Sequence, residues 1–284
     1  MKTYNVIGYA LVGTHLLVSA LMAPESMGPW QGIAVGVAYL VMTWALGGLF
    51  ISDMMHMGIA HRSLEYKPWF LKSVALLNST VGVYVDPVGW INRHRLHHRY
   101  SDHAGDPNKL SSDGFWRTLG LAFSPYPVNA HLANDEVLKT WPFRLISQKL
   151  FGWIAPIISC GAVWLVVRDW PFAIALWISV RFFALWVNMI QNFWAHDRRF
   201  GTRRYDDPDN SVNITEWFPV VATFSACIQN NHHHYANLLR TSHSEDEFDF
   251  GYITVRWMAK IGLVRPTKTG LYKPDDVPLA QLAL

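Results

Sequence analysis

Four long apolar segments constrain the fold of this 284-residue chain more than any other feature. They cover residues 6–23, 33–51, 151–167 and 172–190, and each is close to the roughly 20 residues that a helix needs to cross a bilayer. Charged residues make up only 16% of the chain, well below the roughly 25% usual for a soluble domain. The sequence therefore predicts an all-α integral membrane protein with four transmembrane helices.

The distribution of lysine and arginine predicts how these helices are oriented. Eleven such residues lie within residues 52–150 and ten lie after residue 195, whereas the short links at 24–32 and 168–171 hold one between them. Because cytoplasmic loops carry the excess of basic residues, we expect two helical hairpins with both termini in the cytoplasm. Residues 52–150 and 195–284 would form a cytoplasmic helical cap, and residues 1–284 a single domain.

Two further apolar features need separate interpretation. Residues 69–85 are interrupted by Lys72, Asn78 and Gly82, which favours an interfacial or re-entrant helix over a fifth span. Arg181 lies in the middle of the fourth span, where a charge is costly and usually faces a cavity or a partner. Both a substrate head group and a structural partner are open interpretations for Arg181.

Composition also excludes some classes of protein. The net charge is only +3 and the basic residues form no continuous stripe, which argues against nucleic-acid binding. The two cysteines, Cys160 and Cys227, form no CxxC pair, so neither a disulfide framework nor a thiolate zinc site is indicated.

Nine of the thirteen histidines fall into patterned groups on the predicted cytoplasmic side. HMGIAH follows the second span, HRLHH lies in the middle segment, NNHHHY lies in the tail, and one histidine follows the fourth span. The nine are His56, His61, His94, His97, His98, His196, His232, His233 and His234.

The spacing of these histidines is typical of metal ligands. Helical positions i, i+3 and i+4 share one face, so two or three of the imidazoles of His94, His97 and His98 can point to one place. An i, i+5 pair is about 140° apart on an ideal helix, so His56 and His61 are expected to bind two different metals or to lie where the helix ends. Imidazole suits iron, copper, nickel and zinc, but eight or nine imidazoles exceed the needs of one ion. The histidines therefore predict a two-metal centre. Such a centre beside the membrane could activate oxygen, and the apolar segments could provide a path for an acyl chain.

These motifs resemble those of the membrane fatty acid desaturase family, especially its acyl-CoA desaturase-like branch. HMGIAHRSLEY is similar to the first family box, HxxxxHRS, and GWINRHRLHHRYSDHAGDP to the second, HRxHHxYSDxxxDP. NFWAH resembles the asparagine-to-histidine segment after the last span, and NNHHHY falls where the third box belongs. DNSVN and FDFGYITVRWMAKIGLV extend the likeness, which covers about residues 48–264.

The resemblance implies a four-helix membrane stem under a helical cap that holds two iron ions. Molecular oxygen would remove two hydrogens from a fatty acyl chain carried on CoA, a carrier protein or a lipid, with electrons from an external reductase, cytochrome or ferredoxin. The compact chain favours a bacterial plasma membrane. The implied iron ligands are His56, His61, His94, His97, His98, His196, His232 and His233, with Asn192 acting through water.

The third box departs from the family pattern, which commonly reads HNxHH. Here its first position is Gln229. Either Gln229 supplies a weaker amide oxygen, as in relatives with a QxxHH box, or one metal lacks a ligand, for which His234 would substitute. Asn108 also stands where many relatives have histidine. Hydroxylation, acetylenation or decarboxylation of acyl chains therefore stays open beside desaturation, and a metal transporter is a remote alternative.

Three residues flank the second box. Carboxylates beside ligating histidines often accept the second ring N–H and fix the orientation of the imidazole. Asp102 and Asp106 are candidates for that role, with ordinary loop structure as the alternative, and Trp90 is a further candidate.

Overall fold

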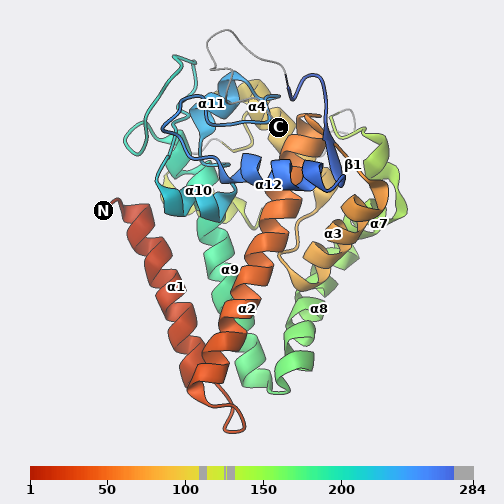
Figure 1. Ribbon diagram of the computed structural model, residues 1–284, viewed down its shortest axis with the longest axis vertical. Coiled ribbons are helices and arrows are strands. Elements are labelled where there is room, and N and C mark those ends of the chain that lie inside the picture. The colour runs from red at the N-terminus through yellow and green to blue at the C-terminus, as the bar shows by residue number, and fades with distance from the viewer. Residues whose placement is uncertain (109–113, 125, 127–131, 272–284) are drawn as a thin grey trace.

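The computed structural model describes residues 1–108, 114–124, 126 and 132–271, and this part of the chain is mostly helical (Figure 1). Four of its helices are long and apolar enough to cross a membrane, which confirms the four predicted spans. They are α1 (Thr3–Leu21), α2 (Pro29–Gly47) with its continuation η1 (Gly48–Ala60), α8 (Lys149–Val167), and α9 (Trp170–Asn192).

The four long helices form a stem that exposes apolar side chains. Leu17, Val41 and Ile157 are among the large hydrophobic residues on its surface, as expected of helices that face lipid. In Figure 1 the short links that join α1 to α2 and α8 to α9 both lie at the lower end of the stem. Asp169 caps the start of α9, because its carboxylate accepts the N–H of Phe172 at 2.8 Å.

The second and fourth apolar helices extend further than hydropathy predicts. α2 runs without a break into η1, in which each turn closes on the fifth residue and not the fourth. Such turns are rare and often occur at functional sites. α9 is followed by the short helix η3 (Trp194–His196). Both extensions enter the cap and carry histidines there.

The apolar segment 69–85 forms α3 (Pro68–Val81), a helix of fourteen residues that packs against α8. It is too short to cross a bilayer, in keeping with the expected interfacial or re-entrant helix. Arg181 of α9 donates from Nη2 to the carbonyl of Gly82 at 2.7 Å, and the amide of Asn78 donates to the carbonyl of Val83 at 2.7 Å. These donors satisfy carbonyls at the end of α3.

The cap lies above the stem in Figure 1. A buried cluster that includes Tyr4 of α1, Trp186 of α9 and Val220 of the cap joins the two parts. Strands β1 (Leu64–Tyr66) and β2 (Val264–Pro266) pair antiparallel, with Leu64 opposite Pro266. The helices of the cap are α4 (Pro87–Tyr100), α6 (Phe115–Leu121), η2 (Glu136–Lys139), α7 (Trp141–Ile146), α10 (Trp217–Thr223), α11 (Gln229–His234) and α12 (Phe250–Lys260).

Candidate metal centre

Eight of the nine patterned histidines gather into two groups where the cap meets the stem. Within each group one ring nitrogen per residue lies within 4.8 Å of the others, which is the spacing of side chains that can hold an ion. The first group is His56, His61, His94, His98 and His232, and the second is His97, His196 and His233.

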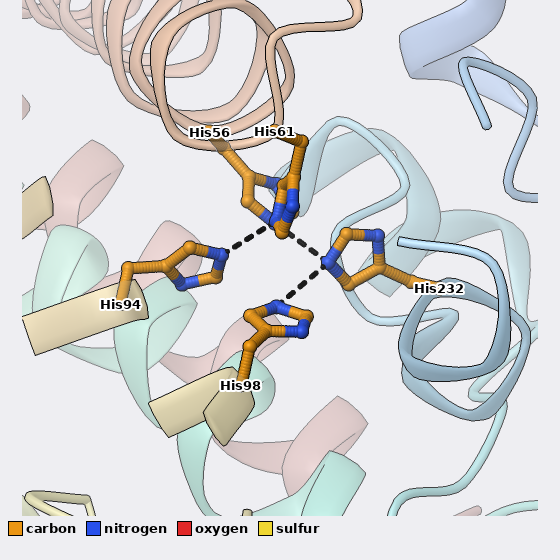
Figure 2. A group of neighbouring side chains, drawn as sticks. All are labelled: His56, His61, His94, His98 and His232. Carbon is orange, nitrogen blue, oxygen red and sulfur yellow. Dashed lines mark hydrogen bonds between the residues drawn. The ribbon is translucent and has the colours of Figure 1, made fainter. Parts of the chain in front are cut away.

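The rings of the first group face one another (Figure 2). The Nε2 atoms of His56 and His232 are 2.9 Å apart, and those of His61 and His94 are 2.8 Å apart. The Nε2 atom of His98 lies 3.1 Å from that of His232. A convergence of five imidazole nitrogens fits a metal ion far better than a set of mutual hydrogen bonds, because each neutral ring has only one N–H to donate.

His56 and His61 belong to the same group, so the expectation that they bind two different metals is wrong. Their ring centroids are 5.0 Å apart. The cause is η1: its wide turns bring position i+5 near position i, and the N–H of His61 donates to the His56 carbonyl at 3.1 Å. The alternative expectation is confirmed, since His61 is the residue that ends this helix.

In the second group every histidine is paired with an aspartate through Nδ1. His97 lies 2.9 Å from Asp106, and His196 lies 3.0 Å from Asp102. The shortest distance, 2.6 Å, joins His233 to Asp209. Because each carboxylate accepts a hydrogen bond from Nδ1–H, it fixes the tautomer and directs Nε2 away from the aspartate. The Nε2 of His233 is buried and has no hydrogen-bond partner among the described residues, as expected of an atom that serves as a metal ligand.

Burial keeps most of these imidazoles neutral. It lowers the pKa of His94, His98 and His232 well below the ordinary value, and the neighbouring histidines lower it further. Burial also lowers the pKa of His233, to about 4, although Asp209 opposes the shift. Neutral imidazole is the form that binds metals, so the centre is electrostatically prepared for them.

The partner carboxylates stay ionised despite their burial. Burial alone would raise the pKa of Asp106, but the hydrogen bond and charge of His97 outweigh it and lower that pKa. The pKa of Asp102 is lowered in the same way by His196. Burial lowers the pKa of His196, but the hydrogen bond and charge of Asp102 outweigh it and raise that pKa. The pKa of Asp209 is lowered as well, so three negative charges lie beside the second group and favour a cation.

A cavity of about 680 Å³ leads from both histidine groups into the stem. His56 and His94 of the first group and His97 and His196 of the second line it. Its middle is walled by apolar side chains, which include Ile51, Val85, Phe183, Ala184 and Val187. A hydrocarbon chain would fit such a cavity, with the two groups at one end.

Comparison with known proteins shows the family of this chain. The family model described as fatty acid desaturase matches residues 29–245, most of the chain. The chain belongs to the fatty acid desaturase family.

Several characterised members of the fatty acid desaturase family are similar to this chain over nearly its whole length. The sn-1 stearoyl-lipid 9-desaturase of Anabaena variabilis is 30% identical, and the alignment covers 90% of this chain and 91% of the relative. The Delta-9 acyl-lipid desaturase 2 of Arabidopsis thaliana is 28% identical over 88% and 78% of the two chains. The hex-5-enoyl-[acyl-carrier protein] acetylenase of Moorena producens is 29% identical over 93% and 84%. The protein is thus an oxidoreductase of lipid metabolism that catalyses fatty acyl desaturation.

Two candidate amides, Gln229 and Asn192, line the same cavity as the histidines. Gln229 is buried and lines the cavity, and its Nε2 donates to the Ala226 carbonyl at 2.6 Å. Its Oε1 accepts no hydrogen bond in the described part of the chain and is free to act as a ligand. Asn192 also lines the cavity. Its Oδ1 accepts from Asn108 at 3.2 Å and its Nδ2 donates to Asn188 at 3.0 Å.

The remaining candidate residues are not members of either histidine group. His234 lies outside the two groups: its Nδ1 is 3.0 Å from Asp207, and its ring stacks on Tyr205 with centroids 3.8 Å apart. Trp90 stacks on the ring of His94, with centroids 4.8 Å apart. Arg181 lines the far end of the cavity. The structure thus offers no role for His234 as a substitute ligand.

Asp209 is the important residue that sequence reasoning did not assign. It holds His233 as Asp106 holds His97, yet it lies 24 residues before its histidine. The only signal was its place at the start of the DNSVN run, which resembles the family without indicating a role.

Proposed function

We propose that this protein introduces a double bond into a fatty acyl chain, in an oxygen-dependent reaction at two iron ions. The observation that carries the proposal is the division of eight converging histidines into two groups at the end of one largely apolar cavity. When bound, such an iron pair supplies the oxidising chemistry with molecular oxygen as co-substrate. The protein provides the metal ligands, excludes water from the site and aligns the substrate.

The first group would hold one ion with five imidazoles, and the second would hold the other with three. Gln229 would add an amide oxygen to the second position, which has fewer imidazoles, because this oxygen is unpaired and the side chain lines the cavity. Asn192 would contribute through water. The carboxylates of Asp102, Asp106 and Asp209 would keep the second group's imidazoles oriented during the reaction.

The substrate would lie extended in the cavity, with its reacting carbons beside the histidines. The apolar walls exclude water from those carbons. The names of two relatives, an sn-1 stearoyl-lipid desaturase and an acyl-lipid desaturase, favour an acyl chain attached to a membrane lipid. CoA and a carrier protein are the other carriers considered. Electrons would come from a separate ferredoxin, cytochrome or reductase.

The membrane arrangement is also part of the proposal. The four spans would form two hairpins within one domain of residues 1–284, with the cap, the metal centre and both termini on the cytoplasmic side. The excess of lysine and arginine in residues 52–150 and after residue 195 supports this orientation. A bacterial plasma membrane would be the location.

A second candidate reaction is acetylenation, in which a double bond becomes a triple bond. It is favoured by the similarity to the Moorena producens acetylenase and by the amide at Gln229, which would change the donors around one ion. Hydroxylation and decarboxylation would use the same centre, but no observation in this chain favours them.

Metal content and lipid products together test the proposal. We expect about two irons per chain in the detergent-purified protein, and new unsaturated acyl chains in the lipids of cells that express it. His97→Ala should remove the product and reduce iron, whereas His234→Ala, outside both groups, should change neither. A triple-bonded, hydroxylated or shortened product would keep the site and change the reaction. One zinc ion or no metal would contradict the proposed centre.

A further inference from the structure

The cavity that begins at the histidines opens sideways on the surface of the stem. Three large apolar side chains among its described lining residues are also exposed: Phe123 at 73%, Phe182 at 56% and Ile178 at 43%. Phe123 follows the end of α6, and the other two lie on α9. A side chain that lines a cavity and is also exposed lies at the rim of that cavity. These three residues therefore mark a side opening.

The side opening lies at the depth of the membrane. Phe182 is next to Arg181, near the middle of the fourth apolar helix that is long enough to cross a bilayer. Ile178 lies one helical turn further from the cap. The hydrocarbon core of a bilayer at this depth contains acyl chains and no water, and all three rim residues are apolar. The side opening consequently faces lipid.

One face of α9 connects the side opening with the metal centre. Ile178, Phe182, Leu185 and Asn192 follow one another at intervals of four, three and seven residues, so they share a face of the helix. All four line the cavity. The ten residues from Phe182 to Asn192 correspond to about 15 Å along the helix axis. A hydrocarbon chain that enters at Phe182 can follow this face to the histidines.

Hydrogen bonds fix the two ends of this route. On the cap side, Arg93 donates from Nη1 to the Leu121 carbonyl at 3.0 Å, which holds the end of α6 against α4. At the far end, Arg181 donates from Nη2 to the Gly82 carbonyl at 2.7 Å and to the Ser159 hydroxyl at 3.1 Å. The second set of bonds joins α9 to α8 and to the end of α3. The far end is thus bridged, and the cavity meets the bilayer at its side.

We propose that the side opening admits the acyl chain of a lipid in the surrounding bilayer, while the polar head of that lipid stays at the membrane surface. Such a chain passes from the bilayer into the cavity without crossing water, so its methylene groups keep apolar surroundings throughout. A chain on CoA or a carrier protein would arrive from water and would need no opening at this depth. The inference rests on the proposed function and extends it, because it identifies a membrane lipid as the carrier of the acyl chain.

A photoreactive lipid tests the side opening without turnover. The full-length, metal-loaded protein would be placed in phosphatidylcholine vesicles without an electron donor. The vesicles would also contain a phosphatidylcholine whose acyl chain carries a diazirine at its middle, and mass spectrometry of peptides would locate the label after irradiation. We expect label on Ile51 and Phe183, which line the cavity. Leu17 and Val41, which are exposed on the stem, should be labelled by the surrounding lipid in any case.

Two substitutions at the rim should change the labelling inside the cavity in opposite directions. Ala122 is exposed and lines the cavity. Ala122→Trp narrows the side opening, so we expect it to lower the inner labelling by about tenfold, the effect of a modest steric clash. Phe182→Ala widens the opening and should raise the inner labelling, and this variant decides the test if Ala122→Trp does not fold. Ala38→Trp is the matched control, because Ala38 is exposed on α2 outside the cavity lining.

Label on Leu17 and Val41 without label on Ile51 and Phe183 would overturn the proposal. Equal inner labelling in wild type, Ala122→Trp and Phe182→Ala would overturn it as well. Inner labelling should persist in His97→Ala, because the side opening does not depend on that histidine. A lipid chain that is labelled inside the cavity but is never desaturated would support the side opening and contradict the proposed reaction, so the two failures are distinguishable.

Discussion

The three aspartates behind the second histidine group differ from anything behind the first. His97, His196 and His233 each lie within 3.0 Å of a carboxylate oxygen through Nδ1. No such pair is present among the described contacts of the five histidines in the first group. Because a carboxylate raises the basicity of its imidazole, the two metal positions should respond differently when a carboxylate is neutralised.

Asp209→Asn tests this difference. The substitution retains the shape of the side chain but removes the charge beside His233, so we expect the affinity of the second position to fall by about 10- to 100-fold. The first position should be unaffected. Equilibrium metal titration of the purified protein would measure both.

Asp207→Asn is the control for that substitution. Asp207 also pairs with a histidine, but that histidine is His234, which lies outside both groups. An equal loss of metal in Asp207→Asn would mean that general charge near the tail segment, and not support of a ligand, determines affinity.

The lowered pKa values predict how metal binding depends on pH. An ordinary histidine is half protonated at a pH of about 6.5, whereas the pKa of His233 is lowered to about 4 by burial. A lowered pKa means that the proton binds only at a lower pH, so neutral ligands persist on acidification. The pKa values of all five histidines of the first group are lowered, so metal at that position should persist after dialysis at a pH of about 6. The second position should lose its metal at a higher pH than the first, because Asp102 raises the pKa of His196. Loss of all metal near a pH of about 6.5, the ordinary histidine value, would contradict this expectation.

At the scale of elements, hydropathy could predict the four long helices but not how two of them end. A continuous apolar run indicates a membrane span, whether its backbone hydrogen bonds follow the α-helical pattern or the wider turns of η1. The wide turns of η1 depend on tertiary contacts that the local sequence does not contain, so the common placement of His56 and His61 could not be foreseen. The same limit applies to Asp209, whose role depends on a coil segment that folds back onto α11. By contrast, HRLHH predicts that His94 and His98 lie together, because i, i+4 neighbours on a helix share a face, whereas His97 lies in the second group.

The junction of α2 and η1 offers an element-scale prediction. The ring of Phe224, a residue of the cap, packs directly against Gly48. A Cβ atom at Gly48 would collide with this ring. We expect Gly48→Ala to destabilise the protein by about 1–3 kcal/mol, as overpacking does, and to reduce metal content by shifting η1. The thermal unfolding midpoint in detergent and metal analysis would show both effects.

Gly47→Ala is the matched control at the preceding position. A Cβ atom there meets nothing within 4 Å, and alanine is favoured over glycine inside a helix by roughly 0.5–1 kcal/mol. The control should therefore be neutral or slightly stabilising. If both substitutions lower the unfolding midpoint equally, the junction needs glycine for its backbone and not for the contact with Phe224.

At the scale of the whole molecule, the proposed metal ligands come from four separate parts of the chain. η1 and η3 extend the stem helices into the cap, while α4 and α11 belong to the cap itself. Ions at the two positions would join these parts at the base of the cap. The buried cluster around Tyr4 and Trp186 joins stem and cap without any of the eight histidines, so the cap should remain attached to the stem without metal.

Metal removal should consequently lower stability without unfolding the stem. An ion that binds only the folded state stabilises it by about 2.7 kcal/mol when its free concentration is about a hundredfold above the dissociation constant. We expect a chelator to lower the thermal unfolding midpoint and to increase proteolysis in the cap, while the helical content of the stem is retained. Before chelation, His97→Ala should already have a lower unfolding midpoint than wild type, and the chelator should lower its midpoint by a smaller amount. His234→Ala should behave as wild type. An unchanged midpoint on chelation would mean that the histidines are held by packing alone, because ions shared by four segments must contribute to the stability of the assembled cap.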